Sequence, residues 1–453
     1  MTTEQQLPEG WEKTTLGEIA TYVNGRAFKP IEWSKTGTPI VRIQNLNNPN
    51  AEYNYYDGYI EEKYHIENGD LLFAWSASLG AYIWKGKSAF LNQHIFKVLP
   101  KENVDKTFIY YLLDKVTSEL YAKAHGSGMV HVTKGKFEAT SVNIPPLETQ
   151  QAIVNKIESL FDEIDEGIGR LKTAAQQIQQ YRQSLLKNAF NGELTKEWRS
   201  KHADTLPSEN ELLAQIQTAR EQHHAQQLAD WQTAVSQWEQ NGKEGKKPSK
   251  PKAPTQAVKF EDNFAGLPSG WGMIKLETLS RKITDGEHFK PPVQEDGIYF
   301  LSAKDIRENG ISLDEPLFID QATAEKARRR CDPEKGDLVI VSRGATVGRM
   351  CLVNIDEIFC LLGSVILIKP LDFINNVFLN FAMQSPKTNQ EMIGLSGSTA
   401  QQAIYLRDIK NINIPICSPA EQTQIVAILE SKLTACDQLA AELAKQLKQA
   451  ELL

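Results

Sequence analysis

Few residues of this sequence stand in patterns that carry out chemistry. An adenine methyltransferase would need Asn or Asp, two prolines and an aromatic residue, and neither Asn143–Pro146 nor Lys290–Val293 fits. No G-x-G-x-x-G follows a predicted strand and no G-x-x-x-x-G-K-[ST] occurs, so a nucleotide-cofactor site lacks support. Asp332–Lys335 holds nuclease-type residues in the wrong order, and Glu61–Lys63 matches only the last part of such a site. We therefore predict a chain that is not an enzyme, with no catalytic residue and no cofactor of its own.

Metal and thiol chemistry are equally unsupported. The 5 cysteines form no C-x-x-C pair, which excludes a zinc ribbon and argues against a disulfide framework. His223–His224 has no acidic or cysteine partner at ligand spacing, so we expect surface residues and no metal. The N-terminus lacks an apolar signal region, and the apolar stretch Ile358–Ile368 is too short to span a bilayer. These features predict a cytoplasmic protein without a membrane partner.

What remains is a set of polar loops rich in residues that recognise nucleic acid. Arg, Lys, Asn and Gln read base edges, Ser and Thr hold phosphates or bases, and glycine allows close backbone approach. The candidate DNA-binding residues of the first half are Lys29, Arg42, Gln44, Trp75, Ser76, Ser78, Asn92, Gln93, His94, Ser127, His131 and Lys134. Those of the second half are Lys290, Lys304, Arg307, Ser342, Arg343, Thr346, Arg349, Ser398, Thr399, Gln401 and Gln402.

The loops are carried by a sequence that repeats itself. Leu7–Trp11, which reads LPEGW, recurs 260 residues later as LPSGW, and a Gly-Asp-Leu triplet follows in each copy. Asn143–Pro145 returns as Asn413–Pro415 in the same order. Such an ordered set of matches indicates a duplicated unit, which establishes architecture but not function.

Each copy alternates short predicted strands with Gly, Pro, Asn and Asp turns, and then meets a proline boundary followed by a long helix. We expect an α+β fold with two β-rich recognition domains separated by two long antiparallel coiled-coil helices. The predicted segments are a first domain at 1–146, a first helix at 147–200, an insert and linker at 201–259, a second domain at 260–418, and a second helix at 419–453.

The two long helices carry apolar seams at heptad spacing. A lone helix would leave its seam in water, so we expect the two helices to pair; docking of each seam on its own domain is the alternative. The predicted spacer and subunit-interface residues are Ile157, Ile164, Leu171, Ile178, Leu185, Leu429, Cys436 and Leu443.

The segment between the copies does not repeat. Ser208–Glu211 forms a capping box that starts a predicted helix, and Lys243–Lys252 follows it with lysines and prolines. A solvated linker is the favoured interpretation of the lysine-rich stretch, and a cationic strap near DNA is the alternative.

Together these motifs resemble the specificity subunits of type I restriction–modification enzymes. The carriers are LPxGW at each start, Gly-Asp-Leu before a strand, the entries Asn143–Ile153 and Asn413–Ile425 to the long helices, and the exit Leu186–Leu194. The resemblance covers nearly the whole chain.

The resemblance implies that the two domains each read one half of a bipartite, asymmetric double-stranded DNA target. It implies that the helices dock two modification subunits, which bind S-adenosylmethionine and methylate adenine, and that restriction subunits can join them. Shared phosphate contacts would then reconcile DNA binding with a formal net charge of −7. One departure is that the second copy reaches Leu453 before any equivalent of Leu185–Leu194, which leaves one expected docking site without its counterpart.

Two other functions fit parts of the sequence. A specificity domain could belong to a combined methyltransferase or nuclease system, although catalytic motifs are missing. A coiled-coil adaptor that binds only protein would not explain two divergent copies with basic and amide-rich loops. The sequence does not define the bases that are read or their spacing.

Overall fold

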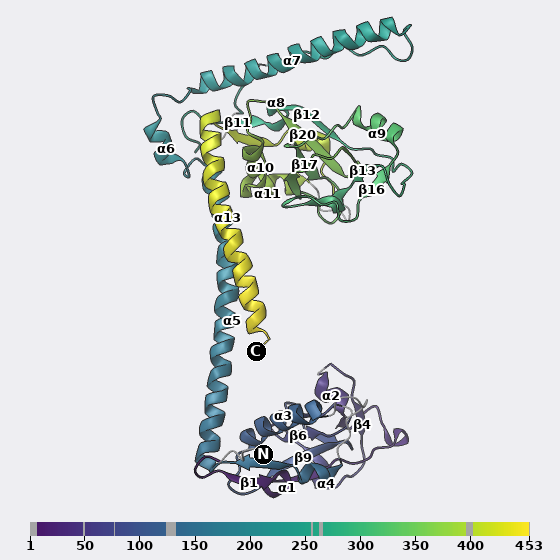
Figure 1. Cartoon of the computed structure of the whole chain (residues 1–453), viewed down its shortest axis with the longest axis vertical. Coiled ribbons are helices and arrows are strands. Elements are labelled where there is room, and N and C mark those ends of the chain that lie inside the picture. Colours follow the sequence, from purple (N-terminus) through teal and green to yellow (C-terminus); the bar gives the residue numbers. More distant parts are fainter. Residues whose placement is uncertain are drawn as a thin grey trace, which may run out of the picture. The chain divides into compact units, whose positions relative to one another are not determined.

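The computed structural model describes residues 7–48, 50–76, 78–123, 133–254, 257–261, 266–395 and 402–452 (Figure 1). The chain divides into two compact units, Met1–Ile168 and Gly169–Leu453. Each unit contains one β-rich domain and part of a long helix, which confirms the predicted α+β class with two repeated domains. No helix among the described residues is both long and apolar enough to cross a membrane.

The first unit holds two four-stranded sheets and one strand pair. The pair joins β1 (Glu12–Thr15) to β10 (Ser141–Ile144). The first sheet has the order β2 (Ala20–Asn24), β9 (Ile95–Pro100), β6 (Leu71–Ala74), β7 (Gly80–Ile83), and the second has the order β4 (Asn54–Tyr56), β3 (Thr38–Val41), β8 (Ala89–Leu91), β5 (His65–Ile66). The helices are α1 (Leu16–Ile19), α2 (Ile43–Asn47), α3 (Lys106–Lys123) and α4 (Lys134–Glu138), with 3-10 turns at Pro30–Glu32 and Glu62–Tyr64.

The second unit contains an equivalent domain. Its strand pair joins β11 (Gly272–Lys275) to β21 (Asn413–Ile416). Its sheets are β12 (Ser280–Asp285), β20 (Val365–Pro370), β17 (Leu338–Val341), β18 (Met350–Leu352); β16 (Leu317–Ile319), β13 (Ile298–Leu301), β19 (Phe359–Leu361); and β14 (Ile306–Arg307), β15 (Gly310–Ile311). The domain helices are α8 (Leu276–Leu279), α9 (Gln321–Arg328), α10 (Asn376–Gln384), α11 (Pro386–Leu395) and α12 (Leu406–Lys410), with a 3-10 turn at Ala303–Asp305.

The duplication extends to strand order and to individual hydrogen bonds. The order β2–β9–β6–β7 matches β12–β20–β17–β18, and β3 runs parallel to β8 as β13 does to β19. Gln150 accepts a hydrogen bond from the Asp105 backbone amide at 2.9 Å, and Gln422 accepts the same bond from Asn375 at 2.9 Å. These bonds fix which residues of the two domains correspond, at the point where each long helix begins.

One glycine in each copy lets the two sheets meet closely. A Cβ on Gly25 would lie 2.0 Å from the carbonyl oxygen of Asn92, and a Cβ on Gly286 would lie 2.0 Å from that of Leu361. Both obstacles are backbone atoms, so neither position accepts a side chain without a backbone shift. The junction between the sheets is therefore built the same way in both domains.

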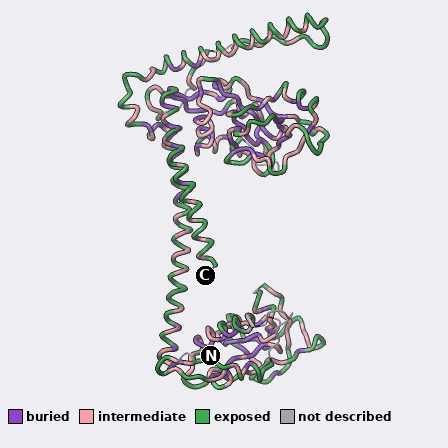
Figure 2. The backbone as a smooth tube through the Cα atoms, in the orientation of Figure 1, coloured by how far each residue is buried: buried purple, intermediate pink, exposed green. Residues whose placement is uncertain are grey.

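The two cores use different side chains for the same architecture. In the first domain Phe73, Phe96 and Phe137 are fully buried and stack on one another, whereas aliphatic residues such as Ile340 and Ile366 fill the corresponding sheet of the second. Each such side chain contributes about 1.5–3 kcal/mol on burial. Figure 2 shows that buried residues concentrate in the strands of the domains, while the long helices are largely exposed.

The long helices α5 (Leu147–Phe190) and α13 (Pro419–Ala450) pair in antiparallel fashion within the second unit (Figure 1). Arg182 forms an ion pair with Asp437, and Lys172 lies 3.6 Å from Glu451, so partners move in opposite directions along the two helices. The predicted antiparallel pair is confirmed. Four seam residues are buried, Ile178, Leu185, Leu429 and Cys436, whereas Leu171 and Leu443 are half-buried.

The N-terminal part of α5 behaves differently from the rest of its seam. It belongs to the first unit, where Phe161 stacks on Tyr111 of α3 with ring centroids 6.3 Å apart. Ile157 lines a groove beside α3, and Ile164 is half-buried. For this part of the helix the alternative interpretation holds, because the seam packs beside its own domain.

The insert forms α6 (Lys196–Lys201) and α7 (Glu209–Gln240), and α7 begins at the predicted capping box of Ser208 and Glu211. The lysine-rich stretch after α7 folds back along that helix. Trp231 Nε1 donates to the Pro248 carbonyl at 3.0 Å, and the Lys250 ammonium lies 5.7 Å from the Trp231 ring centroid. The favoured interpretation as a free linker is therefore wrong for this stretch, since tryptophan side chains hold it in place.

Candidate nucleic-acid interface

In the first domain, several predicted residues meet at one edge of the sheet β2–β9–β6–β7. The Trp75 backbone amide donates to the His94 carbonyl at 3.0 Å, because β6 ends where β9 begins. Trp75 Nε1 donates to Asn24 Oδ1 at 3.1 Å, and the Trp75 ring packs edge-on against His94 at 4.9 Å and stacks on Phe96 at 5.6 Å. The structure thus brings Trp75 and His94 together and adds Asn24, which the sequence did not single out.

The second sheet delivers basic side chains to the same junction. Because β3 and β8 are parallel, Arg42 and Asn92 follow them on the same side, and the Asn92 amide donates to the Val41 carbonyl at 3.1 Å. The Arg42 guanidinium lies 5.4 Å from the Trp33 ring centroid and donates to Asn54 Oδ1 at 3.3 Å. These contacts hold Arg42 in a defined orientation next to the loop 92–94.

Arg26 is a further basic residue at this junction that sequence reasoning missed. Its guanidinium lies 4.7 Å from the ring centroid of Phe28 and 5.0 Å from that of Tyr56, and it bonds Glu32 at 2.5 Å. The carboxyl pKa of Glu32 is lowered by the hydrogen bond from the Lys29 backbone and by the bond from Arg26. No motif marks Arg26, because its aromatic and acidic neighbours become adjacent only in the fold.

Three polar atoms of this junction are buried without a hydrogen-bond partner among the described residues. They are Arg26 Nη1, Asn92 Oδ1 and His94 Nδ1. His94 also has a φ of 76°, which non-glycine residues rarely adopt. Leaving such atoms unsatisfied costs about 1–3 kcal/mol each, and strained backbone gathers at functional sites. We expect a ligand or solvent to complete these hydrogen bonds.

The corresponding edge of the second domain carries different chemistry. The Ser342 amide donates to the Ser364 carbonyl at 2.8 Å, which places Ser342 where the first domain has Trp75 and Ser364 where it has His94. Asp285, the counterpart of Asn24, binds Arg330 and lies 3.2 Å from His288 Nε2. The Asp285–Arg330–His288 cluster was missed because its members are far apart in sequence.

The predicted arginines of the second domain occupy the turn after β17. Arg343 is exposed and pairs through its backbone with Ala403, whereas Arg349 is half-buried and donates to the Ile306 carbonyl at 3.5 Å. Thr346 is half-buried in the same turn. Ser342 differs from the expectation, because its side chain is 2% exposed and its backbone bonds Ser364 and Ile404. Ser342 therefore supports the turn and does not present its side chain at the surface.

The remaining predicted residues are placed as follows. Lys134 donates to the Tyr22 carbonyl at 2.8 Å, and Lys304 donates to that of Glu315 at 2.6 Å, so both reach back to their own domain. Half-buried loop residues are Ser76, Ser78 and Gln93, and exposed ones are Lys29, Gln44, Lys290, Arg307 and Gln402. Five predicted residues lie outside the described residues: Ser127, His131, Ser398, Thr399 and Gln401.

The cysteines are buried in the second unit. Burial raises the pKa of the Cys360 thiol to about 11 and that of Cys351 to about 12. Neutral, buried thiols of this kind fill the core and are poor nucleophiles.

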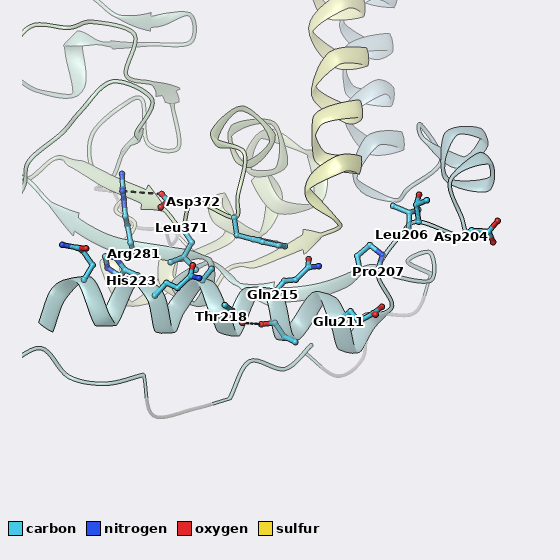
Figure 3. A pocket seen from close by; sticks show the side chains of 16 residues that line it. Asp204, Leu206, Pro207, Glu211, Gln215, Thr218, His223, Arg281, Leu371 and Asp372 are labelled. Carbon is cyan, nitrogen blue, oxygen red and sulfur yellow. Dashed lines mark hydrogen bonds and ion pairs between the residues drawn. The ribbon is translucent and has the colours of Figure 1, made fainter. Parts of the chain in front are cut away.

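A cavity of about 1200 Å³ lies between α7 and the second domain (Figure 3). Arg281 and Asp372, 3.7 Å apart, stand on one side of it, and His223 of α7 lines it. Burial, with Arg281 nearby, lowers the pKa of His223, so this side chain is neutral at neutral pH. Acidic residues Asp204 and Glu211 also line the cavity, and it lies beside the insert rather than at the recognition loops.

The duplicated fold and its paired loop clusters define a class of protein. The family described as the type I restriction modification DNA specificity domain matches residues 8–172 and 294–449, and the chain belongs to this family. Subunits of this family recognise DNA and are not catalytic, which agrees with the expectation drawn from the missing motifs.

Individual relatives support the same assignment. The EcoBI specificity subunit of Escherichia coli is 24% identical over 440 residues, which cover 96% of this chain and 81% of the relative. The EcoKI specificity subunit of E. coli strain K12 is 24% identical over 217 residues, covering 43% of this chain and 46% of the relative.

Two solved structures share the fold. The HsdS subunit from Thermoanaerobacter tengcongensis has a TM-score of 0.52 and 18% identity, with coverage of 99% of this chain and 97% of that one. A chain from a study of complex assembly and conformational transition in the type I R-M system has a TM-score of 0.54 and 18% identity, with coverage of 99% and 96%. At this identity the likeness concerns the fold alone.

Proposed function

We propose that the two domains, assigned to 1–146 and 260–418, each read one half of a bipartite, asymmetric DNA target. The observation that carries this proposal is a shared backbone with different side chains at equivalent loop positions. Asn24, Trp75 and His94 of the first domain correspond to Asp285, Ser342 and Ser364 of the second. Two readers built alike but lined differently would recognise different base sequences.

The paired helices α5 and α13 serve in this proposal as the spacer that docks two modification subunits. Those subunits bind S-adenosylmethionine and methylate adenine, and restriction subunits can join them. The net charge of −7 supports this division of labour, because an acidic chain needs partners to supply phosphate contacts. This function places the chain in the cytoplasm.

Arg343 offers the sharpest local test of the proposed interface. Its side chain is exposed on the glycine turn that follows β17, and its backbone bridge to Ala403 fixes the turn. In the complex with methyltransferase subunits, Arg343→Ala is expected to weaken binding to the target by about 1–3 kcal/mol, if Arg343 contacts guanine through two hydrogen bonds. Binding is measured by fluorescence anisotropy with labelled target and excess non-specific competitor.

Lys335→Ala is the matched control for this substitution. Lys335 is exposed, precedes β17 and so stands at the opposite end of that strand, where it pairs with Asp356 at 2.8 Å. Its loss is expected to leave target affinity within twofold. Equal affinities for the wild type and Arg343→Ala would remove this turn from the interface.

A further inference from the structure

The C-terminal end of α5 is an integral part of the second domain. Leu185, Leu186, Ala189 and Phe190 are at most 7% exposed and belong to that domain's core. Phe190 packs edge-on against Phe378 with ring centroids 5.3 Å apart. A groove on this domain is thus occupied by a helix end from the same chain.

Polar contacts complete the seat of this helix end. Glu421, which is 2% exposed, accepts hydrogen bonds from Thr195 at 2.7 Å, Arg199 at 2.5 Å and the Trp271 indole at 2.9 Å. Gly192 follows the helix with a φ of 83°, and a Cβ there would lie 2.2 Å from Pro268 Cγ. Glycine is therefore required where the segment passes Pro268.

The first domain has the corresponding groove, and the described residues leave it open. Trp11, Phe108, Ile153 and Ile157 line a groove of about 860 Å³. Their counterparts are Trp271, Phe378, Ile425 and Leu429, which are at most 3% exposed. The space left beside Phe190 in the second domain is about 200 Å³.

The correspondence between the grooves rests on bonds as well as on sequence. The Gln150 and Gln422 bonds described above place Ile153 with Ile425, three residues further on in each helix. Phe108 and Phe378 each donate a backbone hydrogen bond to the capping side chain three residues earlier, Asp105 and Asn375. Three of the four first-domain positions are only half-buried, as an unfilled copy of the same seat would require.

We propose that the first-domain groove binds a helix end of the same chemistry as Leu185–Leu194, supplied by another polypeptide. The occupant carries adjacent aliphatic residues, an aromatic residue one turn later, and a glycine beyond it that passes Pro8, the counterpart of Pro268. It needs no basic residue in the place of Arg199, because Thr149 stands where the second domain has Glu421. This site is separate from DNA recognition and does not depend on it.

The probe is a fluorescein-labelled peptide with the sequence of Gln183–Arg199, titrated into the full chain and followed by anisotropy. We expect saturable binding that is at least tenfold weaker for Ile157→Asp, because the aspartate would line the apolar groove. Peptides with Phe190→Ala or Gly192→Val should lose a similar factor. Leu160→Asp is the matched control, since Leu160 lies on the same helix, is 44% exposed and does not line the groove.

Three results would overturn the proposal: no saturable binding, undiminished binding by Ile157→Asp, or an equal loss for Leu160→Asp. Circular dichroism of both variants checks that the long helix is retained. Sedimentation of the chain with and without peptide tests one source of the occupant. Peptide that dissociates a self-associated form would support the groove with a second copy as its natural partner.

Discussion

Replacing Glu421 with alanine is expected to lower the free energy of unfolding of the second domain by about 3–5 kcal/mol. The reason is that the Arg199 guanidinium, 16% exposed, would lose its carboxylate partner while the surrounding structure keeps it from water. The Trp271 indole and the Thr195 hydroxyl would lose an acceptor at the same time. Because these donors come from the segment after α5, the substitution also loosens the attachment of the spacer helix.

Urea titration monitored by hydrogen–deuterium exchange of β17 and β20 peptides measures this loss in the second domain specifically. Asp356→Ala is the control, since Asp356 forms an ion pair with Lys335 but is largely exposed, and such pairs contribute little. If Glu421→Ala shifted the urea midpoint no more than Asp356→Ala, the buried cluster would not be what holds the helix end.

Phe190→Ala is expected to cost about 3–5 kcal/mol in the same measurement, because it leaves a cavity in a packed core. Phe190 is 7% exposed and packs on Phe378, inside the largely aliphatic core that continues into α10 and β21. The loss should appear in second-domain peptides and spare those of β2 and β9, since Phe190 belongs to the core of the second unit.

Tyr181→Ala provides the comparison for Phe190→Ala on the same helix. Tyr181 is 47% exposed, so its removal leaves no closed cavity and should change the second-domain midpoint much less. Equal effects of the two substitutions would mean that α5 acts through its overall helicity and not through a docked end.

The sequence was sufficient to predict the repeated architecture and the helix pairing. Repeats such as LPxGW fall on equivalent strands, and heptad spacing identified Ile178 and Leu429 as buried seam residues. Both signals depend on local periodicity and order along the chain, which the fold preserves. The polar loops also lie at strand ends, as Gly and Asn punctuation indicated.

The details of the loop clusters were not predictable because they depend on contacts across the fold. Arg26 meets Tyr56, and Asp285 meets Arg330, only once the sheets are assembled. The burial of Ser342 follows from its bond to Ser364, which no local pattern reveals. Likewise, Leu185 satisfied the heptad pattern, but its place in the second domain's core requires knowledge of the tertiary packing.

The most direct test of two separate readers is an exchange of the loops of one domain. Residues 51–145 would be replaced by the corresponding segment of a relative, and the modified sites would be mapped by sequencing DNA from cells that also express the methyltransferase subunits. We predict that one half of the methylated target changes while the other half keeps its bases. A change in both halves, or in neither despite retained methylation, would contradict the account of two independent DNA readers.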